Sequence, residues 1–458
     1  MHINKSHYKQ YIAVIGGSIS GSEAANILAN SGFKVVVFEM NTLPYGKIED
    51  GLPNWHINLR NRQIKEIDNK LKHPNIEFVP NFKIGENISF KKLKDEWGFT
   101  AIILANGAWQ DRQLHMPNIG SYLNKEFIYQ NAFINWFNHK HEHNYKGVNY
   151  FIKDKVVVIG GGLASLDVIK IVMMELVKKQ LFLQKGIDVD LFALEKEGIH
   201  KILNKHQVTI TDLGVQKAIL VYRRTAKDMP LKSPKDDSEQ SIEKAKKVSE
   251  RLLNKYCKKY MFNFIQKSIP VGINEESGVL KGIVLQNVQL VNGKVLPIEN
   301  SFNNIDADMI ISSIGSVPEK IAGLPYQNSS LKLKESSSYQ VEGFNNVFAV
   351  GNAVTGRGNI QESKQHGRQI TKQIIEKHLK EDALERWLEN HNATIKNNVK
   401  NQLNDIIKEI IQLKEPSLNE VEGINFKIKK LHKKRVYENY VQWIEDNMPV
   451  RLESLVKK

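Results

Sequence analysis

The chain opens with a regular succession of short apolar runs and amphipathic stretches. Tyr11 to Ile15 is apolar, residues 16–21 form a turn of mostly small residues, and Ser22 to Asn30 carries apolar side chains at helical spacing. A second apolar run, Lys34 to Phe38, ends at Glu39. This pattern predicts a strand, a tight turn, a helix and a second strand.

The same pattern recurs further along the chain. Val156 to Ile159 is apolar and is followed by the turn Gly160-Gly161-Gly162. The helix predicted next has one apolar face, formed by Leu166, Ile169, Met173 and Leu176. Its second strand, Ala218 to Tyr222, comes only after a long insertion with helical pieces, Phe182 to Gln216.

The run from Phe99 into Asn106-Gly107 is apolar, which is typical of a strand buried in a parallel sheet. Asp308 to Gly315 is expected to be another buried strand, and Asn346 to Asn352 leads into a glycine-rich turn. Ile76 to Val79 and Phe82 to Ile84 are expected to be extended. Between Phe262 and Asn292 apolar and polar residues alternate, which predicts an antiparallel β meander. Together these elements predict an α/β fold with two Rossmann-like domains.

The last part of the chain has a different pattern. Its apolar residues step by three and four from Val399 to Leu413, and beyond Pro416 a second stripe runs from Ile424 to Ile444. We expect a helical hairpin packed on the main body, so that residues 379–458 form a C-terminal helical extension. Such stripes belong to a core more often than to a membrane or partner surface.

The residue types of the first turn suit a bound dinucleotide. Gly16 permits a turn too sharp for a side chain, the small Ser18 lets a pyrophosphate approach the backbone, and Gly21 lets the helix pack on the strand. Free N–H groups at the helix N-terminus favour negative charge. Glu39 is placed to accept a hydrogen bond from a ribose hydroxyl. Because the fingerprint reads G-x-S-x-x-G, an ordinary strand-to-helix turn is the alternative.

The second copy ends in Arg223-Arg224 where the first has a carboxylate. Guanidinium groups accommodate the 2′-phosphate of NADP through paired hydrogen bonds, whereas a carboxylate would repel it. We therefore expect NADPH rather than NADH at the turn formed by Gly160, Gly161, Gly162 and Leu163. The alternative is a pair of solvent-facing arginines. Two fingerprints in one chain indicate two dinucleotides.

The cysteine content limits which redox centres the chain can contain. The 458 residues include one cysteine, Cys257, which excludes an intramolecular disulfide, a CxxC redox pair and a cysteine-ligated iron–sulfur cluster within this chain. Redox chemistry would therefore use bound organic cofactors, and we assign no metal ligands. No apolar run approaches the roughly 18 residues of a membrane span, and the first ten residues lack the apolar core of a signal peptide. A cytoplasmic location is expected.

The formal net charge is +15. Such a charge suits an acidic protein partner, nucleic acid or an anionic membrane surface. The chain is also rich in Lys, Asn and Ile throughout, so background compositional bias explains the charge equally well. No recognition motif accompanies the charge, which disfavours nucleic acid.

The two fingerprints, the VYRR strand end at residues 221–224 and the VFAVGN motif at residues 347–352 together resemble flavoproteins of the adrenodoxin reductase type. These are NADPH–ferredoxin reductases, related in fold to glutathione reductase and to the small subunit of glutamate synthase. Pro44 to Asn61 aligns with the family without gaps, and Gly160 to Asp167 follows its NADP-binding turn. Ser18 replaces a family glycine.

The resemblance implies FAD at the first fingerprint and NADPH at the second. It divides the chain into an FAD-binding domain, residues 8–112 with 314–378, and an NADPH-binding domain, residues 113–313. Besides the residues already named, the cofactor-binding set comprises Ser20, Gly46, Lys47, Ile84, Gly107, Gly351, Asn352, Gly358, Asn359 and Ile360. A helix starting near Ile360 would direct its positive end at the flavin. Asn352 departs from the family, which has Asp or Trp there.

The resemblance also places His56 and Asp167 near the flavin, where we expect proton transfer or partner docking. The alternatives are a packed loop imidazole and an ordinary carboxylate in the first turn of a helix. Three functions remain open for the whole chain. It is an NADPH-dependent FAD oxidoreductase feeding an acidic ferredoxin or flavodoxin, a flavoenzyme or electron-input subunit acting on an unknown small molecule, or a cofactor-loaded scaffold whose C-terminal hairpin binds a partner.

Overall fold

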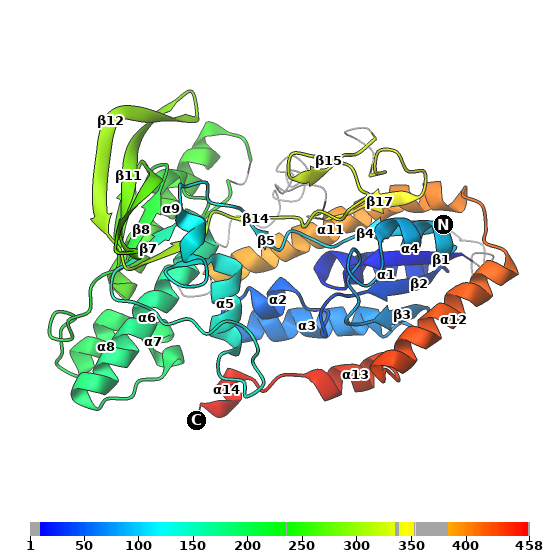
Figure 1. The fold of residues 1–458 in the computed structure, drawn as a ribbon, viewed down its shortest axis with the longest axis horizontal. Helices are drawn as coiled ribbons and strands as arrows, with labels where there is room; N and C mark the ends of the chain where they lie inside the picture. Colours follow the sequence, from blue (N-terminus) through cyan, green and yellow to red (C-terminus); the bar gives the residue numbers. More distant parts are fainter. Residues whose placement is uncertain (1–9, 235, 335–338, 352, 354–382, 457–458) are drawn as a thin grey trace.

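The structure is a computed structural model that describes residues 10–234, 236–334, 339–351, 353 and 383–456 (Figure 1). Two parallel sheets, each flanked by helices, form two units that lie next to each other (Figure 1). This arrangement confirms the predicted α/β fold. Within the described residues, no helix has both the length and the apolar character needed to cross a membrane.

The first sheet has five parallel strands in the order β17-β4-β1-β2-β3. Its strands are β1 (Tyr11–Ile15), β2 (Lys34–Phe38), β3 (Ile76–Val79), β4 (Ala101–Leu104) and β17 (Val347–Ala349). The helices of this unit are α1 (Ile19–Asn30), α2 (Lys47–Asp50), α3 (Ile57–Leu71) and α4 (Phe90–Glu96). Alternate residues of β1 enter two separate cores, one on each face of the sheet. Burial on both faces explains why β1, β4 and β17 are apolar throughout.

The second sheet is also parallel and has the order β6-β13-β7-β8-β9. Its strands are β6 (Phe127–Tyr129), β7 (Val156–Ile159), β8 (Ile219–Tyr222), β9 (Asn263–Gln266) and β13 (Met309–Ser312). The helices of this unit are α5 (Gln130–His139), α6 (Leu163–Lys185), α7 (Leu191–Glu197), α8 (Ile199–Lys205) and α9 (Glu239–Tyr260), with the short turns η2 (Ile119–Tyr122) and η3 (Ala226–Asp228).

The predicted meander is confirmed as a separate antiparallel sheet. Its strands are β10 (Ser268–Glu276), β11 (Val279–Val291) and β12 (Lys294–Asp306), in that order. A small hairpin, β15 (Tyr326–Gln327) with β16 (Ser330–Leu331), follows before β17. Phe82 to Ile84, which was expected to be extended, is not a strand of any sheet, and Ile84 makes a single bridge to Ile88.

Two short strands pair where the chain passes between the two units. β5 (Gln110–Asp111) follows β4 of the first sheet, and β14 (Ser316–Val317) follows β13 of the second. They are antiparallel, with Asp111 opposite Ser316. The pair lies beside both predicted domain boundaries, at residues 112–113 and 313–314, although those boundaries themselves stay a prediction.

The tail contains α11 (Ala383–Ile411), α12 (Leu418–Arg435), α13 (Tyr440–Asn447) and α14 (Leu452–Leu455). The first stripe of α11 is buried with α1 on one face of the first sheet, and Ile424 and Ile428 of α12 enter the core of the other face. The predicted packed hairpin is therefore confirmed. The second stripe is not one helix, because Val436 has a left-handed φ of 54° that ends α12. Figure 1 shows the tail running along the first unit to end beside α5.

Candidate functional site

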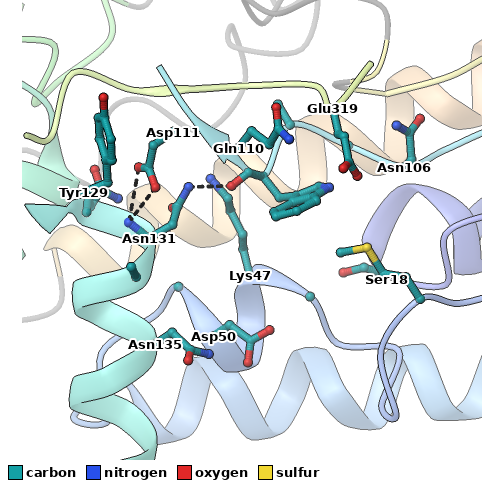
Figure 2. A pocket seen from close by; sticks show the side chains of 18 of the residues that line it. Ser18, Lys47, Asp50, Asn106, Gln110, Asp111, Tyr129, Asn131, Asn135 and Glu319 are labelled. Atoms are coloured by element: carbon teal, nitrogen blue, oxygen red, sulfur yellow. Dashed lines mark hydrogen bonds between the residues drawn. The ribbon is translucent and has the colours of Figure 1, made fainter. Parts of the chain in front are cut away.

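A cavity of about 1530 Å³ lies at the carboxyl ends of the first sheet's strands. Ligands of open α/β sheets bind at this edge. The volume exceeds the roughly 300–1,000 Å³ of sites for drug-sized ligands, so the cavity has room for a dinucleotide. Its lining comes from both units: the first turn and α2 on one side, α5 and Ala164 of α6 on the other. Figure 2 shows one wall of this cavity.

The first turn has the close packing that its sequence predicts. Gly16 has a φ of +99°, and a Cβ on Gly21 would lie 1.7 Å from the carbonyl oxygen of Gly16. Gly21 therefore serves the contact between α1 and β1 and does not line the cavity. Ser18 does line it, and its hydroxyl donates a hydrogen bond to the Tyr45 carbonyl at 2.9 Å.

Glu39 links the turn to the end of β2. Its side chain is 5% exposed, and its two oxygens accept hydrogen bonds from Gly17 N at 2.8 Å and Asn41 N at 2.9 Å. Burial raises the pKa of Glu39 to about 7, although these two hydrogen bonds act in the opposite direction. Each carboxylate oxygen keeps a second lone pair, so Glu39 can still accept from a ribose hydroxyl.

Five of the ten other residues that the resemblance assigns to cofactor binding also line the cavity. They are Ser20, Gly46, Lys47, Ile84 and Gly107. Gly351 lies instead at the end of β17, where a Cβ would be 2.2 Å from the Ser20 hydroxyl oxygen. Asn352, Gly358, Asn359 and Ile360 lie outside the described residues, as does the helix expected after them.

The second turn packs tightly except at its last glycine. A Cβ on Gly160 would lie 2.3 Å from the Ser313 carbonyl, and one on Gly161 would lie 2.0 Å from the ring of Tyr222. Gly162 caps α6 and has nothing within 4 Å of such a Cβ. Gly160 to Leu163 do not line the cavity, but the next residue, Ala164, does. The start of α6 thus reaches the space that the first turn borders.

The two arginines at the end of β8 have different surroundings. Arg223 is exposed. Arg224 donates a hydrogen bond at 3.1 Å to the carbonyl of Gly293, in the turn between β11 and β12. The preceding Tyr222 donates to the Asp228 carbonyl at 3.1 Å, which holds its ring over Gly161.

His56 and Asp167 are buried, at 4% and 6% exposure, and neither lines the cavity. Trp55 donates its indole N–H to His56 Nε2 at 3.0 Å. Lys170 lies 3.4 Å from Asp167 and 3.1 Å from Glu195 and sits 4.5 Å from the centre of the Trp55 ring. Both residues therefore belong to a buried polar cluster that joins the loop before α3 to α6.

Three cavity residues were missed by the sequence analysis. The Asn106 side-chain oxygen is buried and accepts no hydrogen bond from the described residues. Asp111 accepts hydrogen bonds from Asn131 N at 3.2 and 3.3 Å, and burial raises the pKa of Asp111 to about 6 despite the Asn131 hydrogen bonds and the nearby Lys47. Asn106 and Asp111 follow β4, where a ligand site is expected. Asn131 lies in the first turn of α5, and its sequence context gives no such signal.

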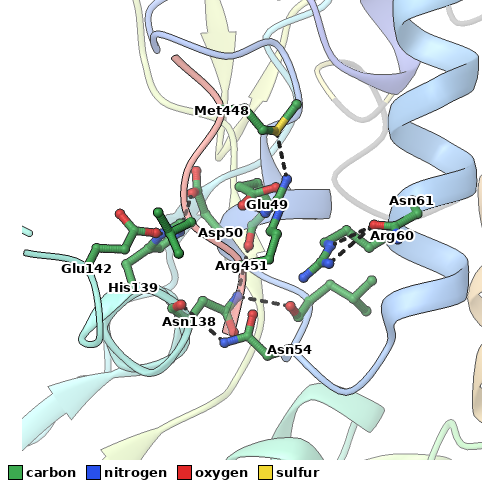
Figure 3. A network of polar contacts seen from close by, with 12 residues as sticks. Glu49, Asp50, Asn54, Arg60, Asn61, Asn138, His139, Glu142, Met448 and Arg451 are labelled. Carbon is green, nitrogen blue, oxygen red and sulfur yellow. Dashed lines mark hydrogen bonds and ion pairs between the residues drawn. The ribbon is translucent and has the colours of Figure 1, made fainter. Parts of the chain in front are cut away.

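A polar network fixes α2 from two directions (Figure 3). Asn138 of α5 donates to the carbonyls of Glu49 and Leu52 at 2.8 and 2.9 Å. From the tail, Arg451 forms an ion pair with the buried side chain of Glu49. Since α2 carries Lys47 into the cavity, both α5 and the tail determine where that lysine lies.

Residues 10–229 match the model of the family described as pyridine nucleotide-disulphide oxidoreductase. The matched residues include both fingerprints, the Arg223-Arg224 pair and most of the cavity lining.

Individual proteins also resemble the chain, over different shares of its length. NADPH:adrenodoxin oxidoreductase, mitochondrial, of Arabidopsis thaliana is 22% identical over 69% of this chain and 70% of its own length. The glutamate synthase [NADPH] small chain of Mycobacterium tuberculosis is 31% identical, over 34% of this chain and 32% of its own length. The structure of Mycobacterium tuberculosis FprA in complex with NADPH has the same fold, with a TM-score of 0.65 and 19% identity over 93% of this chain and 91% of FprA. The resemblance seen in the sequence is confirmed.

Proposed function

We propose that the chain is an FAD-dependent oxidoreductase that accepts hydride from NADPH and passes electrons to a ferredoxin-like protein. One observation carries the proposal. The first turn and the start of α6, which belong to two different sheets, border the same cavity. Two nucleotides held by these turns would bring their reacting ends together in that cavity.

The residues of the cavity fit FAD. The turn at Gly16 to Ser18 and the N-terminus of α1 suit a pyrophosphate, and Glu39 suits a ribose. The buried Asn106 oxygen lacks a donor among the described residues, and a bound polar group would supply one. When bound, FAD and NADPH supply the redox chemistry, and the protein orients them and excludes water.

The second unit fits NADPH. The open space at Gly162 leaves the N-terminus of α6 accessible to a phosphate, and the exposed Arg223 suits the 2′-phosphate. We propose the domain division on the same grounds: residues 8–112 with 314–378 for FAD, residues 113–313 for NADPH, and residues 379–458 as a helical extension.

The net charge of +15 supports an acidic ferredoxin or flavodoxin as the electron acceptor, because opposite charges accelerate association. We also retain His56 and Asp167 as residues of proton transfer or partner docking. Since both are buried in a polar cluster, isosteric variants are the fair test. If His56→Gln and Asp167→Asn leave the pH profile of electron transfer unchanged, the two residues are structural.

The decisive experiment is an anaerobic titration of the purified protein. We expect a yellow protein that is bleached rapidly by NADPH, more slowly by NADH, and that then reduces a ferredoxin at a rate that falls with salt. Exchanging Arg223 for Ala should raise the KM for NADPH and leave that for NADH unchanged. A colourless protein that cannot be reconstituted with FAD would refute the proposal.

A second function is supported by the likeness to a glutamate synthase small chain. Here the chain would be the electron-input subunit of a larger enzyme, or a flavoenzyme with its own small substrate. Rapid bleaching by NADPH combined with slow ferredoxin turnover would favour this function. Acceleration by one metabolite or one co-purifying subunit would then identify the acceptor.

A further inference from the structure

A polar cluster lies where the chain passes between the two units. Lys47 of α2 donates a hydrogen bond to the hydroxyl of Ser316 on β14 at 2.8 Å, and the side chain of Asn131 donates to the same hydroxyl at 3.1 Å. The backbone N–H of Asn131 donates to both oxygens of Asp111 on β5. The β5–β14 pair and the N-terminus of α5 therefore fix the positions of one ammonium and one carboxyl group.

The cluster lies at the end of the cavity where the two nucleotides would meet. Figure 2 shows Ser18 at one end, Asp111 and Asn131 at the other, and Lys47 between them. Ser18 belongs to the turn suited to the pyrophosphate, so the rest of a bound FAD extends away from that turn. Ala164, which comes from the second unit, also lines the cavity. A reacting ring must lie where both units can reach it, which is the end that Lys47 and Asp111 border.

Lys47 contributes a positive charge to this space. Two lysines line the cavity. Lys83 forms ion pairs with Glu86 and with Glu319, at 2.5 and 3.0 Å. Lys47 donates to a neutral hydroxyl and forms no ion pair with the described residues. The walls enclose it, which lowers the pKa of Lys47, while Asp111 has the opposite influence.

Asp111 is the counter-charge. Burial raises the pKa of Asp111 to about 6, so its carboxyl group is mostly ionised at pH 7.5. It faces the same cavity as Lys47 and is held in place by Asn131. The two groups therefore act on the ring end of the cavity with opposite signs.

We propose that Lys47 and Asp111 set the reduction potential of the bound flavin, Lys47 raising it and Asp111 lowering it. The inference rests on the proposed function. Transfer of hydride from NADPH adds two electrons and one proton to the neutral flavin ring, which leaves one negative charge on it, and NADPH becomes NADP⁺. A nearby cation stabilises that anion relative to the neutral ring, and a nearby carboxylate does the reverse. The pair thus determines how readily NADPH reduces the flavin.

The test compares midpoint potentials of the FAD-loaded protein at pH 7.5, measured anaerobically against reference dyes. In Lys47→Met the preference for reduced over oxidised flavin should fall on the order of tenfold, which for a two-electron couple is about 30 mV more negative. Asp111→Asn, which keeps the shape of the side chain, should move the potential by a similar amount in the positive direction. Lys47→Arg keeps the charge and should leave the potential near that of the wild type.

The control is Lys91→Met, which removes the same charge from α4, where the lysine is 85% exposed and does not line the cavity. Its potential should not change, because solvent screens an exposed charge. The affinity for oxidised FAD, measured by flavin fluorescence, is the second readout.

Three outcomes would overturn the inference: unchanged potentials in both variants, shifts of the same sign, or a loss of FAD affinity in Lys47→Met with no change in potential. The last outcome would show that Lys47 binds a phosphate in both redox states. The proposed function fails separately. Suppose that the wild type binds FAD and that the two variants shift the midpoint potential of the flavin in opposite directions, but that NADPH does not reduce the flavin. The inference then stands, and the proposed function is refuted. A wild type that cannot bind FAD refutes both.

Discussion

His139, the last residue of α5, makes the stability of the protein depend on pH. Its Nδ1 lies 2.6 Å from Glu142, and its Nε2 lies 3.3 Å from Asp50, the latter without the alignment of a hydrogen bond (Figure 3). Burial alone lowers the pKa of His139, but the two carboxylates outweigh burial and raise it to about 9, from an ordinary value of 6.5. The protonated imidazole is thus the form that the fold prefers.

The sign and the size of the effect follow from linkage. Because the pKa is higher in the folded than in the unfolded chain, the stabilisation is complete below about pH 6.5 and is lost as the pH rises through about 9. The difference between these two values corresponds to about 3 kcal/mol of unfolding free energy. Asp50 is 41% exposed, so solvent screening makes this figure an upper bound.

The assay is urea unfolding of the wild type and of His139→Gln at pH 6, 7.5 and 9.5. Groups that titrate in both proteins cancel in the difference between their unfolding free energies. The wild type should be more stable by about 3 kcal/mol or less at pH 6, and this advantage should nearly disappear at pH 9.5. In a Glu142→Gln background, the stability advantage that His139 gives should disappear at a lower pH than in the wild type. An advantage that does not change with pH would refute the reasoning.

Two further predictions concern the tail and the second turn. Tyr440→Phe removes the hydroxyl that donates to Asp68 at 2.8 Å, and it should lower the unfolding free energy in urea by about 1.5–3 kcal/mol. The control is Tyr437→Phe, whose hydroxyl makes no hydrogen bond with the described residues. This control should lower the unfolding free energy by under about 0.5 kcal/mol. Equal losses would contradict this. Gly161→Ala places a methyl group 2.0 Å from the Tyr222 ring. The KM for NADPH should therefore rise roughly tenfold to a hundredfold, while the FAD content stays unchanged. An unaltered KM would show that the ring does not border the nucleotide.

The sequence predicted the framework of the fold because local patterns encode it. Strands buried on both faces are apolar throughout, and the helices of the tail carry stripes at helical spacing, so both kinds of element were recognised. The end of α12 at Val436 was not recognised, because a β-branched residue rarely adopts the left-handed conformation that Val436 has. Phe82 and Ile84 are buried in the core without belonging to a sheet, so their apolar character alone did not show whether they pair with a strand.

The candidate site was predictable only where a motif describes it. The turn at Gly16, Ser18 and Glu39 has a fixed spacing along the chain. The cluster of Asp111, Asn131 and Ser316 has none, because its members lie on β5, α5 and β14 and meet only through the tertiary fold. The buried partners of Asp167 gave no signal either, since nothing in the sequence announces that Lys170 pairs across helices with Glu195.

The tail's contact with α2 has a consequence for how the protein is made in the cell. Glu49 is translated early, yet its ionic partner, Arg451, leaves the ribosome some four hundred residues later. The same holds for Arg60 and Glu453. A nascent chain therefore has the contacts of Asn138 with α2 but lacks those of the tail, and we expect α2 and Lys47 to be held less firmly until synthesis has passed Arg451 and Glu453.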